Sequence, residues 1–393
     1  MLNKFQLNND VLTLRDFSIN TRRDLHMMPE LSGKEVETSK YCKALMHQYG
    51  FKIKSYVGHT GFIADLIIDD TLTMLAFRTD MDGLEMEDLT NNQYTSKNKG
   101  CAHNCGHDTH MSIALTTANY LANHPQRLRY NVRFIFQMAE EDMRIDGANK
   151  MVELGCMHGV SEVYALHNDA SQECGKLSIN DHIMSSYGSM WTLDIQGKSA
   201  HSAMPNKGLD AIREGARIIA DMDYIVAKKT DPFSPAVFVC GMFNAGTMPN
   251  VIAGNAQAKG TIRAMDNATN QILINSFVSI VAQSELRGYT TSFSHCGYPA
   301  VVNHTIAYQR VVQAAQKIIP VELLDVNCRS TTGSEDFSYM IEATKNKCGA
   351  MFFLGSGNKE KGIENYLHAT PYFVEDDFLL VGAQIFINLA TDA

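Results

Sequence analysis

Metal-binding side chains are concentrated in one short stretch of the chain. Residues 101–110 have the sequence CAHNCGHDTH, whose cysteines and histidines are preferred ligands of borderline divalent metals such as zinc. Cys105 and His107 are two residues apart and cannot share a helix face, so they suit a loop or the first turn of a helix. We expect the following helix to begin near Thr109, with Asp108 as its cap. The alternative is a buried thiol beside surface histidines.

Two adjacent glutamates, Glu140 and Glu141, come directly after a strand-like run at 131–137. Open α/β sheets bind ligands at the carboxyl ends of their strands. One of these carboxylates can therefore ligate a metal while its neighbour acts as a general base. The alternative is an acidic loop that is fully solvated.

Two further histidines complete the candidate site. His167 follows another apolar strand-like run, and His368 lies near the C-terminus. A lone histidine is more often structural, so the prediction depends on position: the paired glutamates and His167 fall at expected strand ends. Together the candidate groups supply a cysteine, three histidines and a glutamate, which is enough for two metals that share a ligand.

Alternating elements are expected to position these groups. Helices are predicted within 12–49, 109–123 and 147–154, and strands at 61–68, 72–78, 131–137 and 163–166. This alternation indicates an α/β fold with a mainly parallel sheet covered on both faces.

The middle of the chain follows a different order. Strands are predicted at 189–196, 236–243, 256–264 and 290–295, and helices at 210–227 and 270–286. This β-α-β-β-α-β order is typical of a ferredoxin-like α+β domain. We predict a discontinuous catalytic domain, 1–186 and 298–393, with a smaller domain inserted at 187–297.

Composition favours a soluble, cytoplasmic protein. The 393 residues carry a net charge of −9 and include no apolar run near the ~20 residues that span a bilayer, and the first ten residues have no apolar signal core. The acidic excess, without a Lys/Arg cluster, argues against nucleic acid as a partner. Nine cysteines, mostly isolated, indicate reduced thiols. We expect neither a nucleic-acid nor a membrane partner.

The ordered motifs resemble those of the aminoacylase-like dinuclear metallo-amidohydrolase and metallopeptidase family. The similarity is to its Cys-containing branch, with N-acyl-amino-acid amidohydrolases, hippurate hydrolases and auxin–amino-acid conjugate hydrolases. It covers nearly the whole chain. Besides the groups above, it rests on the segments 22–26, 29–31, 78–84, 197–201, 249–252, 260–263 and 334–337.

The resemblance implies two divalent metal ions per chain (zinc, manganese, cobalt or nickel) and Glu140 as the general base. Arg78 replaces a ligand histidine of the wider superfamily, as in the Cys-containing branch, and Asp80 is then expected to orient a ligand. A buried structural aspartate is the alternative for Asp80. The implied metal ligands are Cys105, His107, Glu141, His167 and His368.

The resemblance also implies that the inserted domain is a lid or dimerisation domain. His201 is expected to donate to the oxyanion in the cleft of its own or a partner subunit. Asn250 and Arg263 are expected to bind the substrate, since a guanidinium fork suits a carboxylate. Ordinary surface residues are the alternative for His201 and Arg263. Relatives often dimerise through this domain, which points to it as the surface of any homodimer.

We predict metal-dependent hydrolysis of the amide bond of N-acyl amino acids or related small acylated amines. The lack of a Gly-x-Ser-x-Gly motif argues against a serine hydrolase. The alternatives are a metallo-dipeptidase or carboxypeptidase on the same scaffold, a non-hydrolytic binding homologue, and a structural zinc site, which leaves the paired glutamates unexplained. Gly83, Glu85 and Met138 depart from the branch's usual residues and weaken any transfer of substrate identity.

Overall fold

The computed structural model describes residues 2–392, which form two compact units. The small unit consists of Ser185–Val301 together with Ser330–Glu335, and the large unit consists of the other described residues. Glu140 and all the expected metal ligands belong to the large unit, whereas His201, Asn250 and Arg263 belong to the small unit. The function of the segment 187–297 as a lid or dimerisation domain stays a prediction.

An eight-stranded sheet forms the centre of the large unit. Its strands, in spatial order, are β1 (Lys52–Ser55), β2 (Phe62–Leu66), β4 (Asn131–Gln137), β3 (Met74–Asp80), β5 (Val160–Glu173), β14 (Gly349–Gly357), β6 (Leu177–Ser178) and β13 (Leu324–Asp325). The central strands β4, β3, β5 and β14 pair in parallel. β4 is buried along its whole length, as expected for a parallel strand covered on both faces. The predicted α/β class with a mainly parallel sheet is confirmed.

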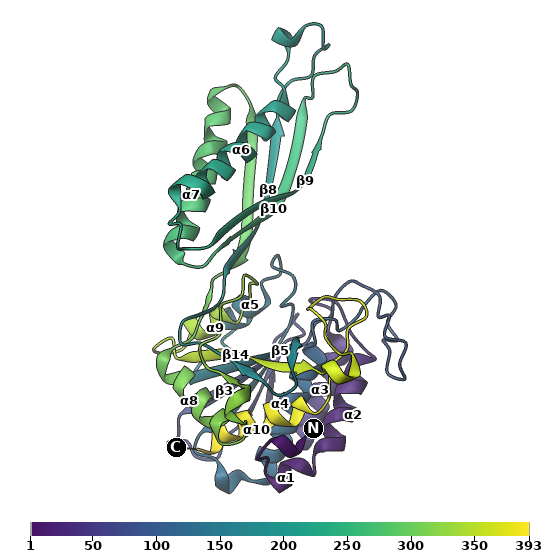
Figure 1. Ribbon diagram of the computed structural model, residues 1–393, viewed down its shortest axis with the longest axis vertical. Coiled ribbons are helices and arrows are strands. Elements are labelled where there is room, and N and C mark those ends of the chain that lie inside the picture. The colour runs from purple at the N-terminus through teal and green to yellow at the C-terminus, as the bar shows by residue number, and fades with distance from the viewer. Residues whose placement is uncertain (1, 393) are drawn as a thin grey trace. The chain divides into compact units, whose positions relative to one another are not determined.

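Helices cover both faces of this sheet (Figure 1). α4 (His107–Asn123) packs against α10 (Phe378–Thr391) and α2 (Arg15–His26), and α8 (Thr305–Gln316) contacts α10. α5 (Gly147–Glu153) and α9 (Ser338–Glu342) contact each other on the opposite side of the sheet. α10 is buried along nearly its whole length, which explains why its sequence is mainly apolar. Its buried Gln384 donates to Asn388 within the helix. The other α-helices described in the large unit are α1 (Asn9–Leu12) and α3 (Val36–Gln48).

The small unit has the predicted β-α-β-β-α-β order. Its elements are β8 (Tyr187–Gln196), α6 (Ala211–Lys229), β9 (Ala236–Ala245), β10 (Asn255–Ala264), α7 (Asn267–Leu286) and β11 (Thr290–Tyr298). The strands pair antiparallel in the spatial order β11-β8-β10-β9. The carboxylates of Asp210 and Asp266 accept backbone N–H groups in the first turns of α6 and α7, which explains where these helices begin.

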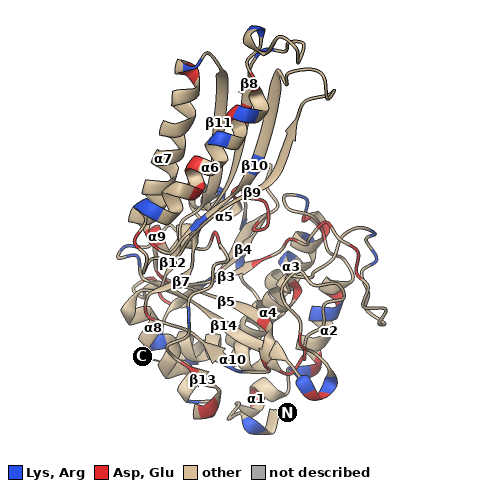
Figure 2. Cartoon of the chain, turned by 45° about the horizontal axis from the view of Figure 1, so that its top comes forward, with Lys and Arg blue, Asp and Glu red and all other residues tan. Residues whose placement is uncertain are grey.

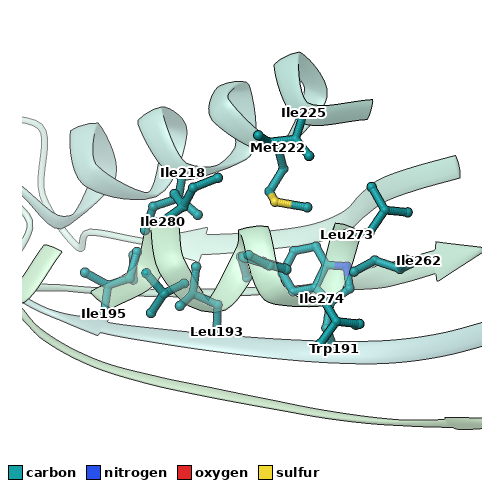
Figure 3. Close-up of a cluster of buried hydrophobic side chains, with 14 of the residues drawn as sticks. Trp191, Leu193, Ile195, Ile218, Met222, Ile225, Ile262, Leu273, Ile274 and Ile280 are labelled. Carbon is teal, nitrogen blue, oxygen red and sulfur yellow. The ribbon is translucent and has the colours of Figure 1, made fainter. Parts of the chain in front are cut away.

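One face of this sheet and the two helices enclose an apolar core (Figure 3). Alternate residues of β8, namely Trp191, Leu193 and Ile195, are buried, as the two-residue period of a strand requires. The Trp191 ring stacks on Phe238 at a centroid distance of 5.3 Å and meets the Phe277 ring edge-on at 5.0 Å. This core is contained within the small unit, which therefore has its own hydrophobic packing.

Charged residues of both signs occur along helices α2 and α6 in the view of Figure 2. Among residues 2–392, no helix has both the length and the apolarity needed to cross a membrane.

Candidate metal centre

Cys105 and His107 lie where a loop enters α4. His107 is the first helical residue, so the expected setting of a loop and a first turn is confirmed. Gly106 between them has a φ of 87°, and an added Cβ would lie 2.2 Å from Oδ1 of Asn168. Only glycine combines this backbone conformation with so close an approach.

Asp108 does not cap α4, so that prediction is wrong. The helix begins two residues earlier than expected, and Gly106 occupies the cap position without a side-chain hydrogen bond. The buried Asp108 carboxylate instead accepts hydrogen bonds from Nε of Arg22 at 2.7 Å and Nδ1 of His26 at 2.8 Å. It therefore ties the first turn of α4 to α2.

The paired glutamates follow β4, as predicted, on a tight turn. Ala139, with a φ of 52°, turns the chain in the left-handed region between the end of the strand and Glu140. Oε2 of Glu140 and Oε1 of Glu141 each lie 3.9 Å from Nε2 of His107. The turn thus brings both carboxylates to the beginning of α4.

His167 and His368 have backbone settings that the sequence did not indicate. His167 lies inside β5, which stays paired with β14 as far as Glu173, so its expected position at a strand end is wrong. The apolar run ends earlier than the strand because the last part of β5 is polar. His368 lies in the loop after β14 with a φ of 64°, and its Nε2 is 3.3 Å from Oε1 of Glu141.

Backbone carbonyls set the tautomers of two histidines. The Nδ1 atoms of His107 and His167 lie 2.9 and 2.8 Å from the carbonyl oxygens of Asp82 and Asn168, respectively. In the neutral imidazoles, these contacts assign the ring proton to Nδ1 and leave an Nε2 lone pair for a metal. Nε2 of His167 lies 3.5 Å from Sγ of Cys105.

The structure brings all five predicted ligands together. Within each of three groups, the candidate donor atoms lie within 4.8 Å of one another: Cys105, His107 and His167; Cys105, Glu141 and His368; and His107, Glu140 and Glu141. Cys105 belongs to two of these groups. Overlapping donor groups of this kind are expected where two neighbouring metal ions share a ligand.

The chemistry of these donors fits divalent cations. Burial, together with the Glu141 and Glu140 carboxylates, holds the pKa of the Cys105 thiol well above its usual range. Burial opposes protonation of His107, but the Asp80 and Asp82 carboxylates outweigh it and raise its pKa to about 10. Among the described residues, buried Nε2 of His107 and Oε1 of Glu141 have no hydrogen-bond partner. A thiol, imidazoles and carboxylates in this setting match the ligand preference of zinc-like metals.

Gly106→Ala is expected to weaken metal binding by at least about tenfold, the lower end of the cost of disturbing groups that orient ligands. The new Cβ must displace Asn168 or shift the Cys105–His107 loop, and the positive φ adds strain. Titration of metal-free protein with Mn²⁺ or Zn²⁺ measures the effect. Gly100→Ala is a useful control, since Gly100 also has a positive φ but its added Cβ would meet no atom within 4 Å. Equal affinities for both variants would contradict the steric explanation.

His110 lies beside the ligands, but its two ring nitrogens are already engaged. Nδ1 lies 2.7 Å from Oδ1 of Asp80, and Nε2 lies 3.0 Å from the backbone N–H of Asn168. The cluster of histidines in the sequence included His110 but could not show these partners. Asp80 also accepts a hydrogen bond from Nη1 of Arg78 at 2.6 Å. Its proposed role in orienting a ligand stays a prediction.

The small unit brings two of its three candidate residues together. His201 forms a β-bridge with Val251, and the carbonyl of Asn250 accepts the N–H of Ser202 at 3.0 Å. The strand β10 begins at Asn255, shortly after Asn250 in the sequence. Arg263 lies near the far end of this strand, about 26 Å from Asn255 along an extended chain. One small unit therefore presents His201 and Arg263 at well-separated positions.

Comparison with known proteins agrees with this geometry. The model of peptidase family M20/M25/M40 matches residues 76–392. The chain belongs to this family. Thermostable carboxypeptidase 1 of Saccharolobus solfataricus is 31% identical over 382 residues, covering 96% of this chain and 95% of that protein. N-acetyl-L-cysteine deacetylase of Bacillus subtilis is 30% identical over 398 residues, covering 96% and 91%.

The solved structure of a dinuclear metal-binding peptidase of the M20 family from Bacillus subtilis has a TM-score of 0.79 and 26% identity, covering 97% of this chain and 98% of that chain. Membership of the M20 family confirms the prediction of a metal-dependent hydrolase of the amidohydrolase and peptidase class. The donor groups and this neighbour together support two divalent metal ions.

Proposed function

We propose that this M20 family member hydrolyses the amide bond of N-acyl amino acids or related small acylated amines. The proposal depends on the different surroundings of the two adjacent glutamates, which allow one to be a metal ligand and the other a general base. Oε1 of Glu141 lies beside both His107 and His368, whereas Glu140 groups with His107 but not with Cys105 or His368. One carboxylate is thus available as a ligand and its neighbour as a base.

In the proposed reaction, Glu140 takes a proton from the water that attacks the amide carbonyl and then gives it to the leaving amine nitrogen. Glu140 is only 8% exposed, which limits competing bulk water at its carboxylate oxygens. Divalent cations held by the five ligands would supply Lewis acidity and lower the pKa of a water. Zinc, manganese, cobalt and nickel all suit a mixed set of thiolate, imidazole and carboxylate groups.

A substrate panel tests the proposal. Wild-type protein should cleave N-acetyl or N-benzoyl amino acids faster than dipeptides with a free amine, and a chelator should abolish the activity. Added Zn²⁺, Mn²⁺ or Co²⁺ should restore it to different extents. A carboxypeptidase is the second candidate, favoured by the similarity to thermostable carboxypeptidase 1. Preference for peptides over N-acyl amino acids would replace the first proposal with the second.

We also propose that Arg263 binds the substrate carboxylate, with Asn250 as a further substrate contact. Arg263 donates from Nη1 to the carbonyl of Thr332 at 2.7 Å, and burial alone accounts for the lowered pKa of its guanidinium. The guanidinium N–H groups of Arg263 that do not donate to Thr332 can therefore bind an external anion. The same panel, extended to substrates with an amidated carboxylate, tests this role. An unchanged KM after amidation would refute it.

His201→Ala is expected to lower kcat about 10²–10³-fold with unchanged metal content, as does the loss of other oxyanion donors. His201 is exposed and its Nδ1 accepts the N–H of Ala203 at 3.1 Å, which leaves Nε2 as the ring's N–H donor. Steady-state kinetics and metal analysis measure the two quantities. If the His201→Ala variant kept the wild-type kcat, His201 would have no part in catalysis and the small unit would be left with the role of a scaffold.

The same variant tests a homodimer, which we propose to form through the small unit. The edge strand β9 exposes Val237, Val239 and Met242, and unpaired strand edges of this kind favour pairing with another chain. If His201 acts in a partner subunit, mixing His201→Ala with Glu140→Gln subunits should restore part of the activity. Activity that stays absent in verified mixed dimers would assign His201 to its own subunit.

The free state of all nine cysteines supports a cytoplasmic location.

A further inference from the structure

The turn that carries Glu140 and Glu141 has an unfavourable backbone conformation. Ala139 has a φ of 52°, a region that costs an L-residue free energy unless its surroundings hold it there. Gly147 helps by leaving room, because an added Cβ at this position would lie 1.9 Å from the carbonyl oxygen of Met138. Space alone does not fix the direction of the turn, so specific partners are needed.

A buried carboxylate far away in sequence supplies one such partner. Oε1 of Glu35 accepts the backbone N–H of Ala139 at 2.8 Å, and also the N–H of Gly33 at 2.8 Å. Its Oε2 accepts the hydroxyl of Thr60 at 2.5 Å. The side chain is fully buried. Three donors thus hold one carboxylate against the turn.

Glu35 directly precedes α3, but its side chain makes no capping hydrogen bond to that helix. Its carboxylate instead reaches a backbone N–H 104 positions along the chain. Burial and the nearby Asp82 carboxylate raise its pKa, so this placement is electrostatically unfavourable.

Asp82 holds the other side of the same turn. Its Oδ2 accepts the backbone N–H of Glu141 at 3.0 Å and the hydroxyl of Ser32 at 2.6 Å. The N–H groups of the residues immediately before and after Glu140 are therefore both bound by buried carboxylates. Hydrogen bonds to charged acceptors are roughly twice as strong as neutral ones.

We propose that Glu35 is a positioning residue that, through the N–H of Ala139, fixes the direction of the Glu140 side chain. The inference rests on the proposed function, in which Glu140 is the general base. Glu35 contacts neither substrate nor metal in this role. It acts on the chemical step because a displacement of about 1 Å at a reacting group can cost 10²-fold in rate.

Glu35→Ala should lower kcat about 10²-fold, change KM less than about threefold, and weaken Mn²⁺ binding to metal-free protein, because Glu141 shares the turn. Glu35→Gln keeps an oxygen acceptor and should recover most of both losses. Ala139→Gly in the Glu35→Ala background should regain about fivefold in kcat, since glycine adopts the positive φ without strain.

Glu30→Ala is the matched control. Glu30 lies in the same segment but binds the N–H of Thr38 in α3, so its loss should leave kcat within about threefold of wild type. If Glu35→Ala does not fold, Thr60→Val replaces it, because removal of the hydroxyl frees Oε2 of Glu35 and should lower kcat severalfold.

Two results would overturn the inference. One is a folded Glu35→Ala protein with wild-type kcat and Mn²⁺ affinity. The other is a loss that Glu35→Gln and Ala139→Gly leave unchanged, which would reduce Glu35 to a general structural role. Glu140→Gln, assayed in parallel, separates this failure from that of the proposed function. An active Glu140→Gln would refute the base assignment, whereas an inactive one beside a fully active Glu35→Ala would refute the positioning role alone.

Discussion

Glu140→Gln should lower kcat by about 10²–10⁴-fold, the usual contribution of a general base, while metal content and KM stay near wild-type values. The amide has nearly the size and shape of the carboxylate, but it cannot accept the proton of the attacking water. The backbone contacts of Ala139 and Glu141, which hold this turn, do not involve the Glu140 side chain. The turn should therefore survive the substitution. Steady-state kinetics and metal analysis of the same preparation measure the effect.

Glu141→Gln is the neighbouring control, with a different expected pattern. Oε1 of Glu141 lies 3.3 Å from Nε2 of His368 and 3.9 Å from Nε2 of His107, so this variant should lose metal as well as activity. If Glu140→Gln kept a near-normal kcat, or lost metal as Glu141→Gln does, the two assigned roles would be wrong.

The spacing of apolar residues predicted much of the fold, because the strand pattern and the helix pattern are clearly separated along the small unit. β8 alternates buried and exposed residues, and α6 and α7 begin at the aspartates Asp210 and Asp266. The same patterns failed in β5, where pairing with β14 extends the strand through polar residues well beyond its apolar run. Tertiary pairing overrides local preference there, and no local signal marks the true end of that strand.

The candidate site, like the fold, was predicted only in part. Residue types and spacing pointed to Cys105, His107 and the two glutamates, and the resemblance added the assignment of each as a ligand or base. The sequence could not show that both nitrogens of His110 are engaged, because its partners lie 30 and 58 positions away. It also placed Asp108 as a cap, although that carboxylate binds Arg22, 86 positions away.

Long-range hydrogen bonds to buried carboxylates explain most of what was missed. Asp82 lies in the family-like segment 78–84 without an expected role, and Glu35 lies in no such segment, yet both bind the backbone around Glu140. Glu35 could have been noticed only as an acid that follows Gly33 and Lys34, close to the segment 29–31, which is not a specific signal.

Cys105→Ser should lower metal affinity by at least about 10²-fold and abolish activity at trace metal concentrations. A hydroxyl is a far poorer ligand than a thiolate for zinc-like metals, and the loss should exceed the 10–100-fold typical of residues that only orient ligands. Cys105 belongs to two of the donor groups, so its replacement should reduce the occupancy of both metal positions. Metal content after dialysis and titration of metal-free protein measure the change.

Cys101→Ser is the matched control for this prediction. Cys101 is also buried and lies four residues earlier, but it belongs to none of the donor groups among the described residues. The loss of its sulfur should therefore leave metal affinity near the wild-type value. Since both substitutions replace a buried sulfur by oxygen, their difference isolates ligation from packing. Full metal occupancy and activity in Cys105→Ser would remove this residue from the metal site, and the two groups it joins would then need a different shared ligand.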